Sequence, residues 1–344
     1  MFAVTGGGTG GHLSVARAIA IELKNRGFDV IFIGSKTGQD ISWFGQNSPF
    51  DKTYFLNTTG VVNRKFFGKI IALLKLFFSL FAIFSIFRTH KIKAIISVGG
   101  FSAAPASIGS IIFRKRLFIH EQNAKIGALN KLLHRASTLS FSSFKLDNFI
   151  QVPHPINTDF ATSKRTRSDL TTVLFLGGSQ GASFINNLAL HIAPFLHKNN
   201  ISIIHQTGKL EYNYIKSAYA KMHINADIFS FGDLLYRVKK ADICIARAGA
   251  SSLFELASNA LPCILIPYPY AASNHQFYNA KFLSDKGLGV LLEQSEIKEG
   301  DLSAFYAKFD FLRHSLFMVS SNLYQYNNIE TNMIDLILKE INAN

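Results

Sequence analysis

Apolar residues come in short runs along this chain, and several runs are followed by glycines and then by a segment with helical spacing. The first run, Met1–Val4, precedes the glycine-rich stretch Thr5–His12. In Leu13–Asn25 the apolar residues recur every three or four positions, and Gly27 follows as a stop signal. This pattern predicts a strand, a glycine turn and a helix.

The same order recurs further along the chain. Strands that alternate with helices are typical of a parallel sheet, so the sequence predicts an α/β fold. The further predicted strands are Phe28–Ile33, Ala94–Val98, Leu117–Ile119, Thr138–Phe141, Thr172–Leu176, Ile201–His205, Asp227–Phe231, Ile243–Ala246, Cys263–Ile266 and Gly289–Leu292.

The chain also shows where one domain gives way to another. Residues 151–172 contain prolines and then a polar, charged run, which predicts a linker. Because 344 residues are many for one core, we expect two Rossmann-like domains, residues 1–157 and 158–327, facing each other across a cleft. The helix-like run within residues 328–344 could pack on either domain, including back on the first.

Three polar loops of the first domain follow predicted strands, where open parallel sheets bind ligands. They are Thr5–His12, Gly99–Phe101 and His120–Asn123. Glycines allow close approach of the backbone, and a helix N-terminus offers N–H groups, so Thr5–His12 is predicted to bind a phosphate. A tight turn without a ligand is the alternative. The chain lacks the Gly-Lys-Ser/Thr of a P-loop and the ribose-binding acid of a dinucleotide site.

Residues 67–87 form a long apolar segment that is charged only at Lys69 and Lys75. The segment is long enough to span a bilayer, but it lies between two strands, where a crossover helix must pack on the sheet. Basic residues throughout 64–93 favour a helix with one face in the core and the other on an anionic lipid surface. A spanning helix and a wholly buried helix are the alternatives.

The net charge of +14, with a pI near 9.7, predicts an anionic partner. The basic residues surround aliphatic and phenylalanine side chains and form no groove-binding motif, so no nucleic acid is expected. A hydrophobic content of 48% excludes a disordered chain. Cys244 and Cys263 lie in apolar runs, as reduced structural cysteines do, and no signal peptide is expected before the first strand.

Polar residues also follow strands of the second domain. Ser179 comes after two glycines, where its hydroxyl can hold a phosphate oxygen or cap a helix. Glu255 can accept two hydrogen bonds from a ribose, although Ser252 and Glu255 also have the spacing of a capping box. Gln276 lies at the start of a predicted helix and suits the recognition of sugar hydroxyls.

Six motifs occur together, in a set order, over nearly the whole chain. They are Gly6–His12, Gly99–Phe101, His120–Asn123 with Asn130 and Lys131, Gly177–Ala182, Arg247–Glu255, and His275–Ala280. Each motif alone is weak, but the series resembles the MurG family. These are the undecaprenyl-pyrophosphoryl-muramoylpentapeptide N-acetylglucosaminyltransferases of bacterial cell-wall synthesis.

The resemblance implies a GT-B fold and the inverting transfer of N-acetylglucosamine from its UDP ester (UDP-GlcNAc) to the muramoyl sugar of lipid I, which gives lipid II. It implies a peripheral protein at the cytoplasmic face of the bacterial cell membrane. No cofactor and no metal are expected, because no cluster has metal-ligand spacing. The substrate-binding residues that the resemblance implies are Thr9, Gly10, Gly11, Asn123, Ser179, Phe231, Ala250, Ser251, Ser252, Leu253, Phe254, Glu255 and Gln276.

On the same resemblance, His12 is the expected general base, taking the proton of the acceptor hydroxyl. A helix N-terminus disfavours imidazolium, which keeps the ring able to accept a proton. Alternatively, His12 only contacts the acceptor pyrophosphate or caps the helix.

The chain departs from the family at the linker, where Pro153–Asn157 replaces the usual Gly-Asn-Pro-x-Arg and a cation expected near the donor is absent. Two other functions stay open: a GT-B transferase for another lipid acceptor, and a non-catalytic sugar-nucleotide-binding membrane adaptor.

Overall fold

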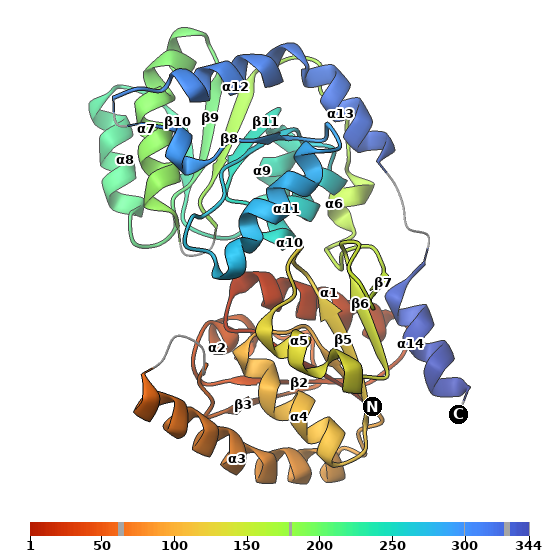
Figure 1. The fold of residues 1–344 in the computed structure, drawn as a ribbon. Helices are drawn as coiled ribbons and strands as arrows, with labels where there is room; N and C mark the ends of the chain where they lie inside the picture. Colours follow the sequence, from red (N-terminus) through yellow and green to blue (C-terminus); the bar gives the residue numbers. More distant parts are fainter. Residues whose placement is uncertain (61–64, 179–180, 299, 327–330, 344) are drawn as a thin grey trace. The chain divides into compact units, whose positions relative to one another are not determined.

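The computed structural model describes residues 1–60, 65–178, 181–298, 300–326 and 331–343. The chain forms two compact units (Figure 1). One unit comprises Met1–Ile156 and Asn328–Asn344, and the other comprises Asn157–Asn327. Each unit contains one parallel β-sheet with helices between its strands, as the alternation of strands and helices predicts.

The sheet of the first unit has the order β3-β2-β1-β4-β5-β6-β7, and each neighbouring pair of these strands is parallel. Its strands are β1 (Phe2–Thr5), β2 (Val30–Ser35), β3 (Lys52–Leu56), β4 (Ala94–Ser97), β5 (Arg116–Glu121), β6 (Leu139–Ser142) and β7 (Ile150–Gln151). Its helices are α1 (Gly10–Asn25), α2 (Asp40–Phe44), α3 (Phe66–Thr89), α4 (Ala104–Ile112), α5 (Ala128–Leu133) and α14 (Met333–Asn342).

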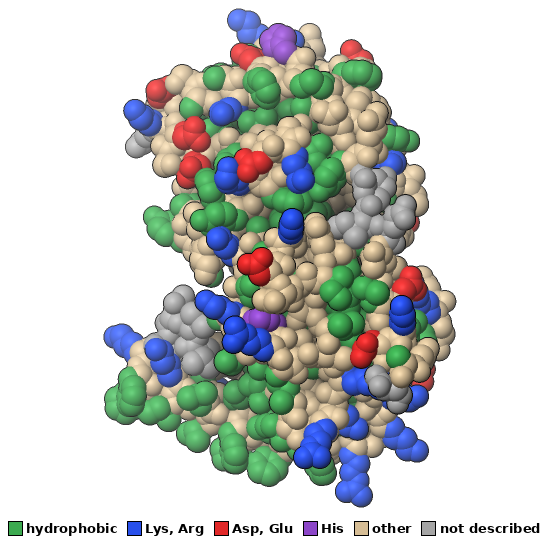
Figure 2. Space-filling model, turned by 45° about the vertical axis from the view of Figure 1, so that its right-hand side comes forward, with side chains coloured by type: hydrophobic (Ala, Val, Ile, Leu, Met, Phe, Trp, Pro, Cys, Tyr) green, Lys and Arg blue, Asp and Glu red, His purple; other side chains and the backbone are tan. Residues whose placement is uncertain are grey.

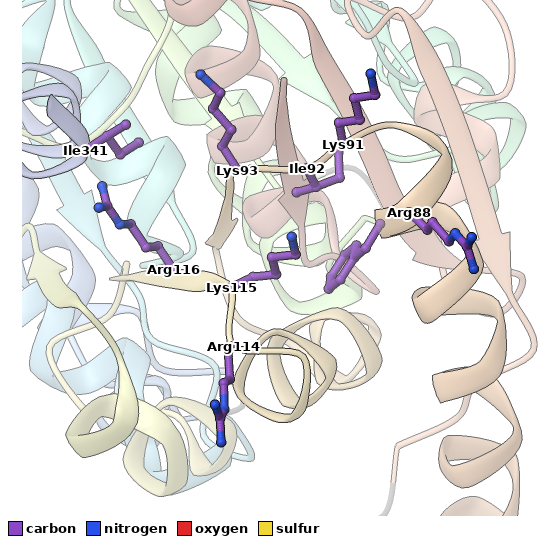
Figure 3. A pocket seen from close by; sticks show the side chains of 9 residues that line it. Arg88, Lys91, Ile92, Lys93, Arg114, Lys115, Arg116 and Ile341 are labelled. Carbon is purple, nitrogen blue, oxygen red and sulfur yellow. The ribbon is translucent and has the colours of Figure 1, made fainter. Parts of the chain in front are cut away.

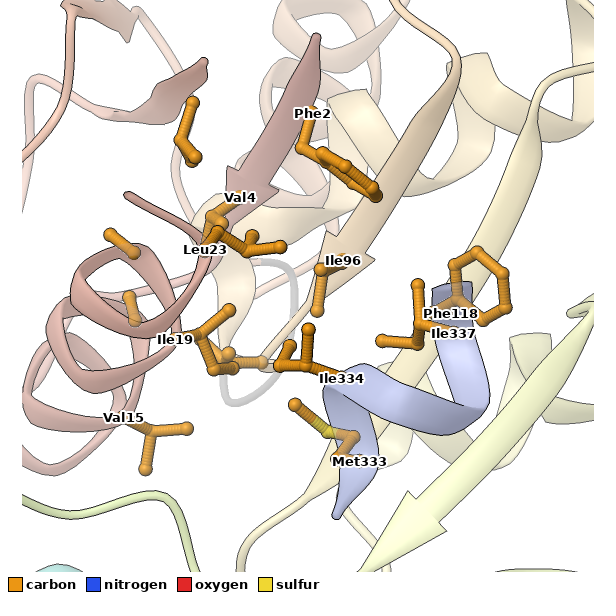
Figure 4. Close-up of a cluster of buried hydrophobic side chains, with 14 of the residues drawn as sticks. Phe2, Val4, Val15, Ile19, Leu23, Ile96, Phe118, Met333, Ile334 and Ile337 are labelled. Atoms are coloured by element: carbon orange, nitrogen blue, oxygen red, sulfur yellow. The ribbon is translucent and has the colours of Figure 1, made fainter. Parts of the chain in front are cut away.

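The C-terminal helix α14 packs on the core of the first unit. Its residues Met333, Ile334 and Ile337 are buried in the same cluster as Ile19 of α1 and Phe118 of β5 (Figure 4). The side chain of Asn332 begins the helix by accepting a hydrogen bond from the Ile334 N–H at 2.7 Å. The last helix of the chain therefore completes the hydrophobic core of the unit that contains the first strand.

The sheet of the second unit has the order β10-β9-β8-β11-β12-β13 and is also parallel. Its strands are β8 (Thr172–Leu176), β9 (Ser202–Gln206), β10 (Ala226–Phe229), β11 (Ile243–Ala246), β12 (Cys263–Leu265) and β13 (Val290–Leu291). Its helices are α6 (Asp159–Thr162), α7 (Ser183–Lys198), α8 (Tyr212–Lys221), α9 (Leu234–Lys240), α10 (Ala250–Ser258), α11 (His275–Ser284), α12 (Ser303–His314) and α13 (Leu316–Gln325).

The stretch predicted as a linker is packed onto the second unit instead of being solvated. Arg167 lies in this polar run, yet its side chain is fully buried. Its guanidinium donates to the carbonyl oxygens of Ala241, Val238 and Asn259 and to the side-chain oxygen of Asn259. Burial of a charged group is tolerated only when its donors are satisfied in this way. The polar run at residues 163–168 was predicted as part of a linker, and the burial of Arg167 within it was not predicted.

Helix α3 joins β3 to β4 of one sheet, as a crossover helix does. One side packs on α4 so closely that a Cβ on Gly109 would lie 2.6 Å from the Ile83 methyl carbon. The other side exposes large apolar side chains, and Figure 2 shows hydrophobic side chains gathered along this edge of the first unit. These exposed residues are Phe66, Phe67, Ile70, Ile71, Leu73, Leu74, Phe77, Phe78, Phe81 and Phe84. By length and composition alone, α3 could also cross a membrane.

Candidate functional site

Each sheet reverses its strand order at one point, and the predicted ligand loops lie at these points. In the first unit the order reverses between β1 and β4, whose carboxyl ends lead into the glycine turns at Gly6 and Gly99. In the second unit the reversal lies between β8 and β11, which lead into Gly177 and Arg247. Open α/β sheets bind ligands at such switch points, so the topology supports one candidate site in each unit.

The two glycine turns of the first unit touch each other through their backbones. The Gly7 N–H donates to the Gly99 carbonyl oxygen at 3.3 Å. A Cβ on Gly100, which has φ +78°, would lie 2.3 Å from the Gly7 carbonyl oxygen. Only glycine combines this conformation with this approach. The turns after β1 and β4 therefore form one rigid loop pair.

We expect Gly100→Ala to disrupt this pair. Its cost combines the left-handed backbone with a backbone clash, about 2–4 kcal/mol of unfolding free energy. Gly27→Ala is the matched control: Gly27 also has positive φ (+81°), but no atom lies within 4 Å of its added Cβ, so about 1 kcal/mol is expected. Urea unfolding of both variants measures the difference. Equal losses would contradict the close approach.

Asp40 anchors the first glycine turn, and sequence reasoning missed it. This fully buried carboxylate accepts hydrogen bonds from the backbone N–H groups of Gly8 at 2.6 Å and Ser35 at 2.8 Å. Burial raises the pKa of Asp40, and the bonds from Ser35 and Gly8 act against that rise. The signal in the sequence was an acid shortly after the second strand, at the start of α2. The Asp40 carboxylate holds the glycine turn through the N–H groups of Gly8 and Ser35.

His12 lies in the first turn of α1, between the loops after β1 and β4. Its Nδ1 is 2.9 Å from the Thr9 hydroxyl. Its Nε2 is directed at the second glycine turn, because a Cβ on Gly99 would lie 3.5 Å from it and 3.1 Å from the Asn130 amide nitrogen. In the tautomer that donates Nδ1–H to Thr9, Nε2 keeps a lone pair and can accept a proton.

Glu121 organises the third loop. The sequence predicted His120–Asn123 as a loop, but His120 and Glu121 are the last residues of β5, so that boundary was wrong. One Glu121 carboxylate oxygen accepts the Asn123 N–H at 2.9 Å, and the other accepts the Gly127 N–H and the Asn130 side-chain amide, both at 2.8 Å. This carboxylate therefore fixes Asn123, and it holds Asn130 beside Gly99, near His12.

His120, which precedes Glu121 in β5, is a fully buried histidine next to this network of polar side chains. Burial first, and then the nearby charge of His12, lower the pKa of His120 to about 3, so its ring is neutral at physiological pH. Its Nε2 lies 3.3 Å from the Ser143 hydroxyl, which contacts His154 Nδ1 at 2.7 Å. Thr9, His12 and Asn130 are thus brought together from separate parts of the first unit, and Glu121 holds both Asn130 and Asn123.

In the second unit, Ser179 lies outside the described residues. Helix α7 begins at Ser183, with Ala182 preceding it and no side-chain cap. The Ser183 hydroxyl and the Asn186 amide both donate to the carboxylate of Glu211. Asn186 also contacts the buried ring of His205 at 3.0 Å. Glu211 and Asn186 were not singled out from the sequence.

The capping-box interpretation of Ser252 and Glu255 is wrong. Helix α10 begins at Ala250, Gly249 occupies the cap position, and no side chain caps it. Ser252 is therefore already inside the helix, and Glu255 lies too far along it to close a capping box. Leu253 is 1% exposed and belongs to the hydrophobic core of the second unit. The remaining predicted residues of this group are Ala250 and Ser251, which are buried, and Phe254, which is half-buried.

Two polar side chains tie the loops of the second site together. The buried Asn279 of α11 donates to the Ala248 carbonyl oxygen at 3.1 Å, next to the start of α10. Arg247 donates to the carbonyl oxygens of Ile266 and Pro267 and to the Gln294 side chain, and burial lowers its pKa to about 10. These contacts join the ends of β11 and β12 to α11. The sequence contained both residues within motifs but did not indicate this bracing role.

The other predicted donor residues differ in exposure. Gln276 is half-buried, and its side-chain oxygen accepts the Tyr268 N–H at 2.9 Å, so its amide nitrogen can donate to a ligand. Phe231 lies beyond the end of β10 with its side chain 53% exposed. Asn157, at the position where the family has arginine, contacts Asp159 at the start of α6. Among the described residues, no group of three His, Cys, Asp or Glu could hold a metal ion.

Buried neutral histidines make stability depend on pH. Burial lowers the pKa of His205 to about 3, below the 6.5 of an unfolded histidine. Below pH 6.5 the unfolded chain binds more protons, so stability falls on acidification, by about 2 kcal/mol for this residue at pH 5. His205→Gln should reduce the difference in unfolding free energy between pH 7 and pH 5 by that amount. The exposed His314→Gln should leave the difference unchanged, and urea unfolding at both pH values tests this.

The chain matches Glycosyltransferase family 28 N-terminal domain over residues 2–141 and Glycosyltransferase family 28 C-terminal domain over residues 172–333. A protein of Campylobacter fetus is 50% identical over 341 residues, which cover 99% of this chain and 100% of the relative. It is named UDP-N-acetylglucosamine–N-acetylmuramyl-(pentapeptide) pyrophosphoryl-undecaprenol N-acetylglucosamine transferase. A Helicobacter hepaticus protein of the same name is 49% identical over 302 residues, 86% of each chain. This chain belongs to that transferase family.

Solved structures agree with this family in fold. The MurG of Acinetobacter baumannii has a TM-score of 0.76 at 24% identity and covers 98% of this chain and 99% of its own. A UDP-GlcNAc 2-epimerase from Neisseria meningitidis, bound to UDP-GlcNAc, has a TM-score of 0.66 at 12% identity and covers 100% of both chains. The predictions of a GT-B fold, of a glycosyltransferase and of membership in the MurG family are confirmed.

Proposed function

We propose that this protein transfers N-acetylglucosamine from UDP-GlcNAc to the muramoyl sugar of lipid I, forming lipid II with inversion at the anomeric carbon. The observation that carries the proposal is the loop pair after β1 and β4. It holds His12 with one ring nitrogen on Thr9 and the other directed at Gly99. Membership in the transferase family supplies the substrates.

His12 acts as the general base in this proposal. The acceptor hydroxyl oxygen attacks the anomeric carbon, and its proton passes to His12 Nε2. The bond from that carbon to the phosphate oxygen breaks, and its electron pair leaves with UDP. Thr9 keeps the ring in the tautomer with a basic Nε2. Inversion needs no covalent intermediate, and backbone N–H groups at helix starts offset the charge that develops on UDP.

The second unit is proposed to bind most of the donor. Helix α10 offers the N–H groups of its first turn, and Glu255 lies further along the same helix; together they suit uridine and ribose. The amide nitrogen of Gln276 is oriented by Tyr268 and suits the sugar hydroxyls. The proposed donor contacts are Thr9, Gly10, Gly11, Asn123, Ser179, Phe231, Ala250, Ser251, Ser252, Leu253, Phe254, Glu255 and Gln276. Phe231 would act through its backbone beside the uracil.

The test is release of UDP by the purified full chain, with and without a lipid I analogue that carries a short, soluble prenyl chain. We expect release to depend on the acceptor and to be faster from UDP-GlcNAc than from UDP-glucose. If the full chain binds UDP but releases none in an acceptor-dependent way, the proposal is contradicted. Activity only with a different lipid acceptor would replace lipid I while keeping the transferase.

We also propose that the exposed face of α3 lies on the anionic cytoplasmic face of the cell membrane, without spanning it. Phe77, Phe78 and Phe81 are more than half exposed, and Lys69 and Lys75 lie on the same helix. Such a face inserts into the headgroup boundary. Binding to anionic vesicles should weaken as salt rises. Retention in membranes through both high-salt and alkaline washing would instead support a spanning helix.

A further inference from the structure

A strongly basic pocket lies in the first unit, at the amino ends of β4 and β5. Its volume is about 600 Å³, within the range of small-molecule sites. Three stretches contribute to it: the end of α3, the turn into β4, and the turn from α4 into β5 (Figure 3). Its cationic lining residues are Arg88, Lys91, Lys93, Arg114, Lys115 and Arg116.

The bottom of the pocket is apolar, and the cations around it differ in how exposed they are. Phe87 and Ile92 are at most 2% exposed and form the floor. Lys115 and Arg116 are half-buried, whereas the other four cations are exposed. Figure 3 shows Lys115 extending in the direction of Ile92 and Arg114 pointing away from it. The exposed cations are therefore free to turn onto a ligand that Lys115 already faces.

Within the part of the chain that the structure describes, no carboxylate side chain forms an ion pair with any of the six cations. The lining itself contains no acidic residue. Arg116 donates only to a backbone carbonyl oxygen, that of Glu340, at 3.1 Å. Like charges around one pocket repel one another, and an anion bound among them offsets that repulsion.

Ordinary helix-end stabilisation accounts for only part of the cluster. A cation at the C-terminal end of a helix complements the helix dipole, which accounts for Arg88 and Lys91 at the end of α3 and for Arg114 and Lys115 just after α4. Lys93 immediately precedes β4, and Arg116 is the first residue of β5. No helix dipole places cations at the starts of these two strands.

The pocket is separate from the catalytic loops. Lys93 precedes the first residue of β4, whereas Gly99 follows the last residue of the same strand. The pocket and the glycine turns thus lie at opposite ends of one parallel sheet. A ligand in the pocket is neither the donor nor the reacting part of the acceptor.

We propose that this pocket is a discrete binding site for a multiply phosphorylated anion. Arginine forks and lysine ammonium groups are the side chains that recognise phosphate oxygens. Phe87 and Arg88 belong to α3, whose exposed face is apolar, so the phosphates of an anionic lipid headgroup are the favoured source. This choice of source rests on the proposed membrane contact. The proposal of a phosphate-binding site does not rest on that contact, because a soluble polyphosphate carries the same phosphate groups.

The experiment compares two charge-matched double variants of the full chain. The pocket variant is Arg114→Gln with Lys115→Gln, and the control is Lys216→Gln with Lys221→Gln on α8 of the second unit, outside the pocket and outside α3. Calorimetric titration with inorganic tripolyphosphate at about 0.15 M salt measures the site directly. Flotation with phosphatidylcholine vesicles, with and without phosphatidylglycerol, tests the lipid source. Turnover of a soluble acceptor is measured in parallel.

Wild type should bind tripolyphosphate saturably at a single site, and the pocket variant should lose about tenfold or more in affinity while the control keeps it. If the pocket variant also floats less than the control, a lipid supplies the phosphates. Undiminished flotation assigns the site to a soluble anion. Equal losses in both variants, or no saturable binding by wild type, would overturn the site. Both variants should turn over the soluble acceptor like wild type, so a failure of the transferase proposal shows up separately.

Discussion

His12→Ala is expected to lower kcat by about a thousandfold while UDP-GlcNAc still binds. Proton transfer by a positioned base contributes roughly 10²–10⁴-fold to a rate, and the structure offers the Nε2 lone pair of this ring beside Asn130 and Gly99. Steady-state kinetics with a soluble acceptor measure the loss. The acidic limb of the pH–rate profile should weaken in the variant, because the proposed base is no longer there to be protonated.

A second substitution separates a base from a mere contact at this position. His12→Gln keeps a hydrogen-bonding side chain but cannot accept a proton at neutral pH. If His12 is the base, the glutamine variant is as slow as the alanine variant. Recovery of most of the activity by glutamine, with changes confined to the acceptor KM, would assign His12 to acceptor binding. Thr9→Val should slow turnover to a smaller extent, because it removes only the orienting hydroxyl.

Arg167→Met is expected to destabilise the second unit by about 3–5 kcal/mol. The substitution keeps an unbranched side chain but leaves the buried carbonyl groups of Val238 and Asn259 without the Arg167 donor, while the Ala241 carbonyl keeps its bond from Arg165. Because native domains are stable by only 5–15 kcal/mol, this loss is large. Urea unfolding followed by circular dichroism measures it.

The exposed Arg313→Met on α12 is the matched control and should change stability by less than about 0.5 kcal/mol. A loss below about 1 kcal/mol in Arg167→Met would mean that water replaces the guanidinium. In that case residues 163–168 would behave as the solvated linker that their composition suggested.

The central strands and the helices that follow them could be predicted from the local pattern of apolar residues and glycines. The strand–glycine–helix order at Met1–Asn25 and its repetition after Thr172 were readable because burial on both faces produces continuous apolar runs and because glycine marks tight turns. The short edge strand β7 and the polar-flanked β3 were missed. Both are only partly buried, so their sequences lack the apolar run of a central strand.

The sequence indicated individual candidate site residues, but it did not indicate which side chains hold them in place. The motifs identified His12, Asn123 and Glu255 because phosphate and sugar chemistry uses a small set of residue types. Sequence spacing suggested a capping box for Glu255, and the actual helix start at Ala250 removed it. Asp40 escaped notice because its role depends on the Gly8 N–H, more than thirty positions away in the chain.

The sequence by itself determined the α/β class, the division into two similar halves and the family to which the chain belongs, since periodicity and motifs are local properties. Only the tertiary structure decided that α14 completes the first core, that Arg167 is buried and that six cations gather around one pocket. Each of these depends on contacts between residues far apart in the chain. Their free energies come from burial and from hydrogen bonds that form only once the sheets exist, so no window of the sequence contains them.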